Sequence, residues 1–538
     1  MFAATRQSAA LRAGLQVGLA MVLALGIYVA VNQTFVLYAL GGFNTRGVLV
    51  SLVLCFVVVA GFTGTMFWAL RTSWWARLPL MFLMVASATT HYALLKINKS
   101  ELTLSMVTWL LAELDQTGHA FEEFARPIAV SLLWCGLAMA SMLALSSGMA
   151  RREPLLLTTS ARRWLKPCAA GLFVLAASAS LFLPTFVPAD TGLYGLAART
   201  LLFASVPAPR AVLQVPQQAP RVRKIVMVID ESLIPGPHVN AAVAPMGAGV
   251  IDYGVAWSSG SCSAASNALL RWGVDAKEVG TVHDPREHTP LWAMAKAAGF
   301  RTVLIDAQRA TQRPQNFMRA AELAQVDEVM PMDSGLDSDV HVAEALARIL
   351  ERPEPTFVYI VKRGVHFPYA HNLPEAVAAQ YKGDRMGGYL AAVSFTTGRF
   401  FERLARERPG LKDTLLLYTS DHGQMMDGGP THCRYDPAAL AQWRVPMLAM
   451  GEGVARVPGL VANAPCWKDA ASHQNLRAAA LEAMGYDDHS AQPGGFASLS
   501  RCDRPAAVPL FVGALPFPTA AHEALRFKWM PLQPAGTP

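Results

Sequence analysis

The sequence is poor in charged residues. Asp, Glu, Lys and Arg make up 16% of its 538 residues, and hydrophobic residues make up 53%. A globular protein ordinarily carries about 25% charged residues, so the shortage excludes a chain that is soluble throughout. Apolar runs crowd the first 190 residues, whereas the rest has an ordinary globular composition. A chain of this length can form two or three units, and we expect a membrane part followed by a soluble part.

Five apolar stretches in the first part are long enough to cross a bilayer, which takes about 20 helical residues. They lie near residues 15–38, 47–69, 78–95, 127–148 and 168–188. The first run is too long for a cleaved signal peptide, and no small-residue cleavage pattern follows it. One such stretch alone is also typical of a buried core helix. Five in succession favour a five-helix transmembrane domain over residues 1–190.

The basic residues of the short loops predict the orientation of these spans. One side carries Arg6, Arg12, Arg71, Arg77, Arg151, Arg152, Arg162, Arg163 and Lys166, and the other carries Arg46, Lys96, Lys99 and Arg126. The richer side belongs in the cytoplasm, so the N-terminus is predicted inside and everything after about residue 190 outside. The net charge of +7 fits these loops and does not indicate a nucleic-acid partner.

Two connecting segments have their own patterns. Between the third and fourth stretches, LSMVTWLLAELDQTGHAFEEF has apolar residues at helical spacing and acids on the other side. It predicts an amphipathic helix near residues 100–124, lying on the outer membrane surface or packed on the soluble domain. Residues 191–222 contain the proline-rich run SVPAPRAVLQVPQQAP and are predicted to be a linker.

The soluble part, residues 223–538, has no internal repeat and no long low-complexity segment. Short apolar runs alternate with helical patterns, and the runs are KIVMVI (224–229), RTVLI (301–305), TFVYIV (356–361), TLLLYT (414–419) and VPMLAM (445–450). Runs that are apolar throughout and separated by helices predict an α/β domain with a largely parallel sheet covered by helices on both faces. Ligands of such sheets gather at the carboxyl ends of the strands.

Carboxylates and imidazoles follow three of these predicted strands. Glu231 comes after the first strand, His366 after the third, and Asp421 with His422 after the fourth; His432 is ten residues further on. Each of these residues alone could equally be a helix cap or a solvated loop residue. Together at one edge of the sheet they predict a site for a divalent metal, zinc above all.

A nucleophile is expected in WSSGSCSAASNALLRWG, residues 257–273. Small residues and hydroxyls run there into a helical pattern, and a helix N-terminus favours a bound phosphate. Metal coordination can lower the pKa of a hydroxyl at this position. Serines at a helix start are equally typical of capping, and spacing alone leaves Ser261, Ser263 and Ser266 open.

The order of these features resembles the bacterial phosphoethanolamine transferases, membrane members of the alkaline phosphatase and sulfatase superfamily. It comprises five spans, a linker, a strand ending in Glu-Ser, a hydroxyl-rich helix start, a later His, then Ser-Asp-His-Gly and another His. The resemblance covers nearly the whole chain. The stretch AGFRTVLIDAQ, residues 298–308, also looks like a family stretch that ends in Ser-Asn-Gln.

The resemblance implies a role for each matching residue. Ser263 and Ser266 match the family pattern Thr-x-x-Ser-x-Pro, with Ser263 as the nucleophile. The implied zinc ligands are Glu231, Asp421, His422 and Ser263. One or two ions are expected, with manganese or magnesium as alternative metals. His366 and His432 are implied near the phosphoryl group, and Ser266, Asp230 and Lys362 are expected to bind the substrate. The four cysteines outside the spans allow three pairings, among which the sequence does not select. We favour Cys262–Cys433 and Cys466–Cys502, whereas Cys55, Cys135 and Cys168 are expected to be free.

The sequence departs from the family in a few places. Serine replaces the usual threonine nucleophile, Ala268 replaces a proline, and Phe367 replaces the glycine of His-Gly-Pro. The extra carboxylate of Asp230 is a ligand or a partner of one. Sulfatases carry Cys-x-Pro-Ser-Arg at this position, and the stretch that begins at Cys262 lacks both the proline and the arginine. These departures bear on the acceptor more than on the chemistry.

The resemblance implies transfer of phosphoethanolamine from phosphatidylethanolamine to an envelope acceptor: lipid A, the lipopolysaccharide core or a periplasmic glucan. A covalent serine intermediate, a monomer and a bacterial inner-membrane location with a periplasmic catalytic domain are implied with it. Three alternatives stay open: a phosphoglycerol transferase, a phosphodiesterase, and a non-catalytic envelope scaffold.

Overall fold

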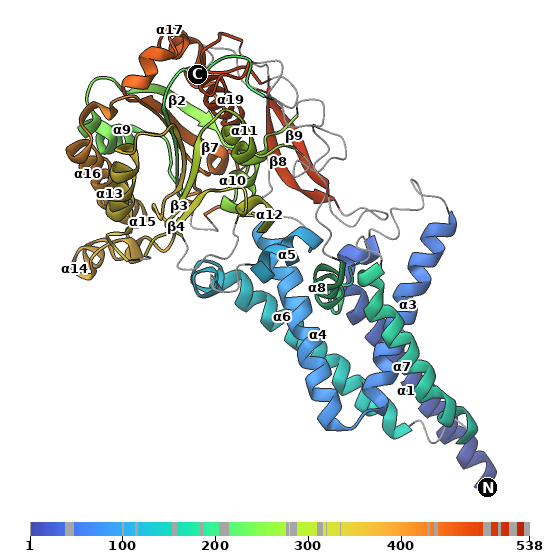
Figure 1. Ribbon diagram of the computed structural model, residues 1–538. Coiled ribbons are helices and arrows are strands. Elements are labelled where there is room, and N and C mark those ends of the chain that lie inside the picture. The colour runs from blue at the N-terminus through green and yellow to red at the C-terminus, as the bar shows by residue number, and fades with distance from the viewer. Residues whose placement is uncertain are drawn as a thin grey trace. The chain divides into compact units, whose positions relative to one another are not determined.

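The computed structural model divides the chain into two compact units (Figure 1). The residues that it describes are 2–37, 48–98, 102–112, 117–152, 159–182, 187–203, 215–275, 279, 288–308, 316–318, 320–333, 335–427, 431–434, 439–487, 496–503, 507–515 and 524–531. The first unit comprises residues 1–114, 124–205 and 515–523, and the second comprises 115–123, 206–514 and 524–538.

The first unit is helical. Its helices are α1 (Phe2–Val31), α3 (Val48–Arg71), α4 (Trp74–Asn98), α5 (Leu104–Ala112), α6 (Thr117–Arg152), α7 (Thr159–Phe182) and α8 (Gly192–Phe203). Helices therefore occupy all five positions where spans are predicted. Three of them, α1, α4 and α6, contain a described stretch that is long and apolar enough to cross a membrane, and α3 contributes the shorter apolar stretch Phe56–Met66. The spans at α3 and α7 remain predictions.

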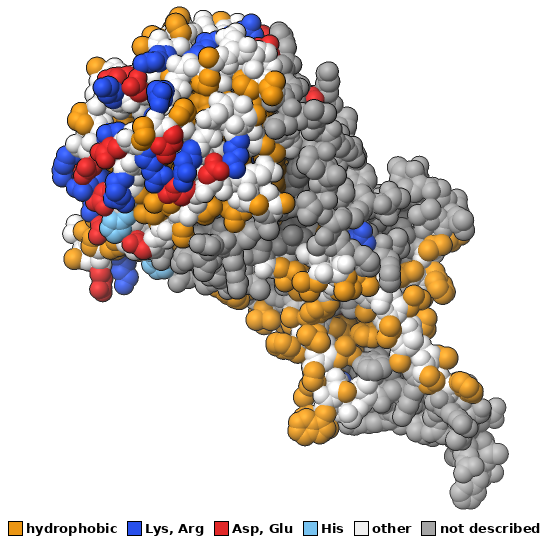
Figure 2. Space-filling view, in the orientation of Figure 1, with side chains coloured by type: hydrophobic (Ala, Val, Ile, Leu, Met, Phe, Trp, Pro, Cys, Tyr) orange, Lys and Arg blue, Asp and Glu red, His pale blue; other side chains and the backbone are white. Residues whose placement is uncertain are grey.

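The surface of the first unit agrees with a membrane environment. Figure 2 shows orange side chains over its described face, whereas blue and red side chains gather over the second unit. Leu19, Phe56, Phe82 and Leu133 are examples of large apolar residues that this helical unit exposes. Exposed apolar surface of this kind is typical of helices that face lipid.

Two of the connecting segments differ from the prediction. The helix expected near residues 100–124 is two helices, α5 and the first turns of α6, and residues 113–116 between them lie outside the described part. Helix α6 leaves helical geometry at Phe124, three residues before Pro127, because a proline ring disfavours helical backbone ahead of it. Residues 192–203 form helix α8, whereas a linker was expected from residue 191. Their run LYGLAARTLLF is apolar enough to pack on α4, α5 and α7.

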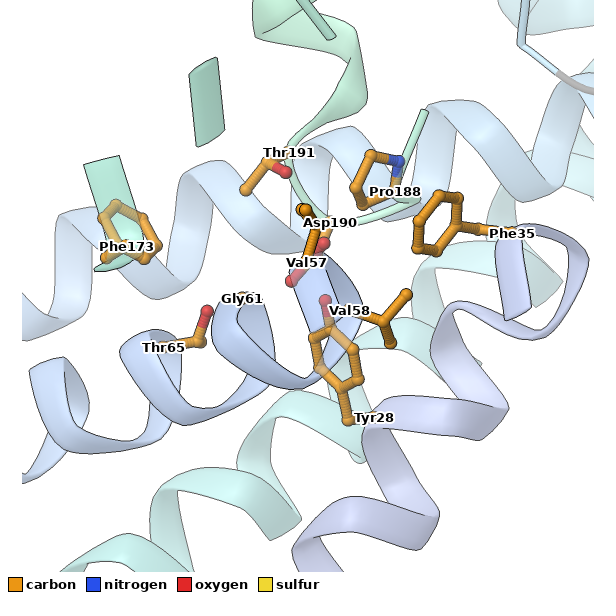
Figure 3. Close-up of a pocket in the computed structure, with 10 residues that line it drawn as sticks. All are labelled: Tyr28, Phe35, Val57, Val58, Gly61, Thr65, Phe173, Pro188, Asp190 and Thr191. Carbon is orange, nitrogen blue, oxygen red and sulfur yellow. The ribbon is translucent and has the colours of Figure 1, made fainter. Parts of the chain in front are cut away.

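A small cavity lies within the first unit (Figure 3). Its volume is about 10 Å³, and Tyr28 and Asp190 are both directed into it. Burial raises the pKa of Asp190 to about 7, and its Oδ1 atom has no hydrogen-bond partner among the described residues. Such a space holds about one water molecule, so it is too small for a substrate.

The second unit is built on a seven-stranded sheet in the order β2-β7-β6-β1-β5-β3-β4. The strands are β1 (Lys224–Asp230), β2 (Ile251–Trp257), β3 (Arg301–Asp306), β4 (Glu328–Pro331), β5 (Thr356–Val361), β6 (Thr414–Ser420) and β7 (Arg444–Met450). All neighbouring pairs are parallel except those that β7 makes with β6 and β2. The predicted, largely parallel sheet is therefore confirmed. Strands β2 and β4 were not predicted, because β2 is interrupted by Gly254 at φ +74° and β4 has only four residues.

Helices cover both faces of this sheet, as predicted (Figure 1). Ile225, Met227 and Ile229 of β1 belong to a core that includes α11 (Leu291–Ala297) and α19 (His473–Ala483). Val226 and Val228 belong to a second core, with α13 (Ser338–Leu350), α15 (Arg385–Val393) and α16 (Arg399–Glu407). The remaining elements are α9 (Pro237–Val243), α10 (Ser263–Trp272), α12 (Ala320–Leu323), α14 (Glu375–Ala378), α17 (Gly459–Ala462), α18 (Ala464–Trp467), and the two-stranded sheet β8 (Ala507–Leu515) and β9 (Ala524–Pro531).

Candidate active site

The parallel pairing of β1 with β6 brings the predicted acidic residues together. In this register Asp230 lies opposite Ser420, so the residues that follow each strand emerge side by side. Those residues are Glu231 after β1, and Asp421 with His422 after β6. All three side chains are almost completely buried, with exposed fractions of 0 to 1%.

Glu231, Asp421 and His422 form a cluster that can hold a metal ion. Each offers one ligand atom, and these atoms lie within 4.8 Å of one another. The Nε2 atom of His422 is 3.4 Å from Glu231 Oε1 and 3.6 Å from Asp421 Oδ2. The Nδ1 atom of His422 donates a hydrogen bond to the carbonyl oxygen of Gly423, at 2.8 Å. This bond directs Nε2 into the cluster, where it can bind a metal ion once it has released its proton, as in metal-binding histidines.

The charges of the cluster fit a divalent cation. Burial and the nearby charge of Glu231 raise the pKa of Asp421 to about 8. Burial also opposes the charge of Glu231, but the hydrogen bond and positive charge of His422 hold its pKa well below the usual value. Asp421 Oδ2 has no hydrogen-bond partner among the described residues. Two buried carboxylates beside one imidazole fit a divalent ion, which would balance their charge and take up the unpaired oxygen.

Ser263 is the hydroxyl that reaches this cluster. It is the first residue of α10, following the N-cap Cys262, and its side chain is half-buried. Its Oγ atom donates to Glu231 Oε2 at 3.1 Å and lies 3.2 Å from His422 Nε2. A metal ion bound by those two ligands would therefore have Ser263 Oγ within reach as a further ligand.

The other two candidate serines face away from the cluster's open side. Ser261 is fully buried and its Oγ atom donates to the carbonyl oxygen of Arg434, at 3.3 Å. Ser266 is fully buried as well, and its hydroxyl donates to the carbonyl oxygen of Asp421. This corrects the expectation that Ser266 contacts the substrate. It lies one helical turn after Ser263, and the turn carries its side chain behind the cluster.

The two predicted histidines lie beside the cluster. The ring of His432 stacks on that of His422, with centroids 4.3 Å apart, and the His366 centroid is 6.1 Å from that of His432. The favoured disulfide Cys262–Cys433 is present and joins the helix start at Ser263 to the loop that carries His432. The second favoured pair, Cys466–Cys502, is also present.

Asp230 and Lys362 do not face the substrate side, contrary to the prediction. Lys362 Nζ donates to Asp230 Oδ2 at 2.5 Å, and both side chains are fully buried. Tyr418 and Thr397 donate to the same oxygen, at 2.6 and 2.9 Å. Alternation along β1 turns Asp230 toward the layer of α13 and α16, whereas Glu231 follows the end of the strand. The pair therefore supports the cluster from below, because Asp230 Oδ1 accepts a hydrogen bond from the backbone N–H of Glu231.

Two further residues hold Glu231 in place and were not among the predicted site residues. Gln308 Nε2 donates to Glu231 Oε2 at 2.7 Å and to the carbonyl oxygen of Lys362 at 3.0 Å. Ser232 donates to Glu231 Oε1 at 2.6 Å, and its backbone N–H donates to Asp421 Oδ1 at 3.0 Å. Gln308 ends the stretch AGFRTVLIDAQ, so a signal for it was present in the sequence. For Ser232 the only signal in the sequence was its position next to Glu231.

His473 lies between helix α10, which carries Ser263 and Ser266, and the end of β6, which precedes Asp421 and His422. It is fully buried, and burial lowers its pKa to about 3, so the ring is neutral. Its Nε2 atom donates to the carbonyl oxygen of Ser420 at 2.9 Å, and Nδ1 accepts from the backbone N–H of Ser259 at 3.3 Å. Nδ1 is also 3.2 Å from the hydroxyl of Ser266. Nothing in the local sequence around residue 473 distinguishes this histidine from an ordinary core residue.

We expect His473→Ala to lower the turnover number by about 10- to 100-fold, as is typical of lost positioning contacts. Unfolding should become easier by about 1–3 kcal/mol, because buried polar partners lose their hydrogen bonds. The metal content should stay at the wild-type level, since the ligands are untouched. His473→Gln should recover part of the activity. Steady-state kinetics, elemental analysis and denaturant unfolding measure the three quantities, and His341→Ala, at the exposed α13 histidine, is the matched control. An unchanged turnover number in His473→Ala would contradict the role.

Comparisons with known proteins agree with this architecture. The family model named Sulfatase matches residues 255–486, and this range contains Ser263, His366, Asp421, His422 and His432. No curated protein matches the chain. The resemblance seen in the sequence is confirmed to this extent: residues 255–486 match the Sulfatase family model, and the fold of the chain is like that of the membrane transferase described next.

Three solved structures illustrate the likeness. Lipooligosaccharide phosphoethanolamine transferase A of Neisseria meningitidis, an integral membrane protein, is 14% identical, with 88% of this chain and 97% of that chain covered and a TM-score of 0.51. The zinc complex of the C-terminal periplasmic domain of EptC from Escherichia coli is 17% identical, covering 59% and 96%, with a TM-score of 0.46. Lipoteichoic acid synthase LtaP from Listeria monocytogenes is 11% identical, covering 55% and 79%, with a TM-score of 0.38.

Proposed function

We propose that the protein is a membrane-anchored, metal-dependent phosphoethanolamine transferase, with phosphatidylethanolamine as donor and an envelope glycolipid or glycan as acceptor. One observation carries this proposal: Ser263 Oγ lies 3.1 Å from Glu231 and 3.2 Å from His422, in a chain that also has membrane-type helices. The fold shared over 88% of the chain with an integral membrane transferase supports the same reading. A bacterial inner-membrane location, with residues after about 190 in the periplasm, and a monomeric enzyme belong to the proposal.

Zinc is the proposed metal, held by Glu231, Asp421 and His422 with Ser263 as the remaining ligand. When bound, the ion supplies a positive charge that lowers the pKa of a nearby hydroxyl. Hydrogen bonds within the protein hold the proposed ligands in position. Gln308 and Ser232 fix the carboxylate of Glu231, and the bond to Gly423 fixes the tautomer of His422.

The proposed reaction has two balanced steps. In the first, Ser263 Oγ forms a bond to the phosphorus of phosphatidylethanolamine, the phosphorus–oxygen bond to diacylglycerol breaks, and the proton of Ser263 ends on the diacylglycerol oxygen. In the second, the oxygen of an acceptor hydroxyl or protonated phosphate forms the new bond to phosphorus, the bond between phosphorus and Ser263 Oγ breaks, and the proton of the acceptor returns to Ser263 Oγ. Covalent catalysis divides one difficult displacement into two easier ones.

His366 and His432 are proposed to contact the transferred group. His432 stacks on His422, so it lies near the hydroxyl that attacks. An imidazole in this place can donate to a phosphoryl oxygen or pass a proton to the leaving oxygen. The N-terminus of α10, where Ser263 is the first residue, adds backbone N–H groups that favour a phosphate.

The proposal is tested with purified full-length protein and head-group-labelled lipids. We expect diacylglycerol release from phosphatidylethanolamine, a phosphoethanolamine adduct on the enzyme, and loss of one modified envelope molecule when the gene is deleted, as read by mass spectrometry. Activity on phosphatidylglycerol alone would favour the phosphoglycerol transferase. Release of the head group only into water would favour the phosphodiesterase. No release of the head group from either lipid would favour a non-catalytic envelope scaffold.

A further inference from the structure

An apolar groove lies on the second unit, outside the cluster. Its volume is about 390 Å³, and its lining residues are Leu373, Val377, Tyr381, Ala391, Ser394, Phe395 and Arg399. This size is within the range of about 300–1,000 Å³ that small-molecule sites occupy. The lining comes from two stretches: residues 373–381, which include α14, and the helical stretch that joins α15 to α16.

A π-helical turn forms one wall of the groove. The turn η8 (Ser394–Gly398) interrupts the helix between α15 and α16, and such turns are rare and frequently found at functional sites. Phe395 of this turn lines the groove. Two residues further on, Thr397 is fully buried and donates to Asp230 Oδ2 at 2.9 Å. Asp230 in turn accepts from the backbone N–H of Glu231, so the groove wall is linked by hydrogen bonds to a metal-type ligand.

The other wall of the groove continues into the loop of His366. Leu373 follows directly after Asn372, and Asn372 Nδ2 donates to the carbonyl oxygen of His366 at 2.6 Å. The guanidinium of Arg385 lies over the ring of Phe367, the residue that follows His366, 5.2 Å from its centroid. Leu373, which lines the groove, therefore directly follows a residue that holds the His366 loop.

We propose that this groove binds an acyl chain of the donor phospholipid. The inference rests on the proposed function. A lining that is mostly aliphatic and aromatic fits a hydrocarbon chain, and its strongly polar members are Ser394 and the charged Arg399. The guanidinium of Arg385, which lies over Phe367 next to His366 in the sequence, would complement the negative phosphate to which such a chain is attached.

The donor fits the groove better than the acceptor. In a glycerophospholipid the reacting phosphorus is separated from the acyl chains only by the glycerol carbons. In a glycolipid or glucan acceptor, the reacting oxygen is on a sugar or on its phosphate. A chain site whose lining residue Leu373 adjoins the His366 loop therefore suits the molecule whose phosphorus is proposed to react there. Phe367, which replaces a glycine of the resembled family, adds an apolar ring directly after His366.

The test compares donors with and without chains. The full-length protein is assayed with long-chain phosphatidylethanolamine and with glycerophosphoethanolamine, which has the same head group and no chain. Ala391→Trp fills the groove from a partly exposed position, and Ala379→Trp, at an exposed residue outside the lining, is the matched control. We expect Ala391→Trp to lower kcat/KM about tenfold or more on the long-chain lipid and less than about twofold on the chainless donor, as expected for the loss of a buried apolar contact. The control should change neither.

A second readout is independent of turnover. Phosphatidylethanolamine with a photoactivatable group in its chain should crosslink to the peptide that contains Phe395 in the wild type and in Ala379→Trp, and not in Ala391→Trp. Crosslinking without head-group release would support the groove and refute the proposed transferase. Head-group release with equal losses on both donors, or with no loss in Ala391→Trp, would refute the groove and leave the transferase standing. Crosslinking of a chain-labelled acceptor glycolipid in place of the phospholipid would also overturn the assignment.

Discussion

Ser263→Ala is expected to abolish transfer and to leave no labelled enzyme after incubation with labelled phosphatidylethanolamine. Removing the nucleophile deletes the covalent route, so the rate should fall by about 10⁴-fold or more. The geometry supports this choice among the three serines. Only Ser263 is partly exposed, and its Oγ atom lies within 3.2 Å of His422 Nε2. Ser261 and Ser266 are fully buried and bond to backbone carbonyl oxygens.

Two matched variants sharpen this test. Ser266→Ala should stay measurable, at about 1–10% of the wild-type rate, because it removes one contact that positions Asp421 and no reacting atom. Ser263→Thr should keep part of the activity, since it restores the residue of the resembled family. The modified peptide is mapped by mass spectrometry for each purified variant. An adduct on Ser261 or Ser266, or an active Ser263→Ala enzyme, would overturn the assignment.

The sequence predicted the site where residue type and strand position were sufficient. Glu231, Asp421 and His422 follow two strands that turn out to be neighbours and parallel, and any parallel sheet brings such residues to one edge. The sequence-based prediction was wrong where the role of a residue depends on the direction of its side chain. Asp230 is adjacent to Glu231, yet it points into the layer of α13 and α16 and pairs with Lys362. Neighbouring residues of one strand point to opposite sides, so the proposed metal ligand Glu231 is adjacent to a carboxylate that is buried in the helical layer.

Contacts made by distant segments could not be predicted in this way. His473 reaches Ser420 and Ser266 from a helix that follows the sheet, and its local sequence reads as ordinary helix. Strand β2 carries a glycine at positive φ and is only partly buried, so its apolar pattern is weak. The sequence predicts a linker where helix α8 lies, because prolines dominate the composition of the residues that follow it. The apolar face of α8 packs on α4, α5 and α7, and contacts between segments so far apart could not be predicted from the local sequence.

Asp421→Asn is expected to remove bound zinc and activity while the fold remains. The substitution keeps an oxygen that can accept from the backbone N–H groups of Ser232 and His422, at 3.0 and 2.7 Å in the wild type. Burial and the charge of Glu231 raise the pKa of this carboxyl to about 8, so without a metal it must bind a proton on folding at pH 7, whereas the neutral asparagine needs none. The metal-free variant should therefore unfold at a temperature equal to or above that of the metal-free wild type. His422→Ala should also lose zinc, but with some loss of stability because its ring packs on His432.

Adding zinc separates the metal site from a merely structural cluster. A ligand that binds only the folded state stabilises it by about 4 kcal/mol at a thousandfold excess over its Kd, so the wild type should gain several degrees in Tm. Asp421→Asn should gain none, whereas Asp333→Asn, at an exposed carboxylate beside His341, should behave as the wild type. Elemental analysis should find zinc in the wild type and in that control, and little in Asp421→Asn or His422→Ala. Full zinc content in both ligand variants would show that the metal lies elsewhere, because a site that has lost either a buried carboxylate or its imidazole retains too few ligands to hold the ion.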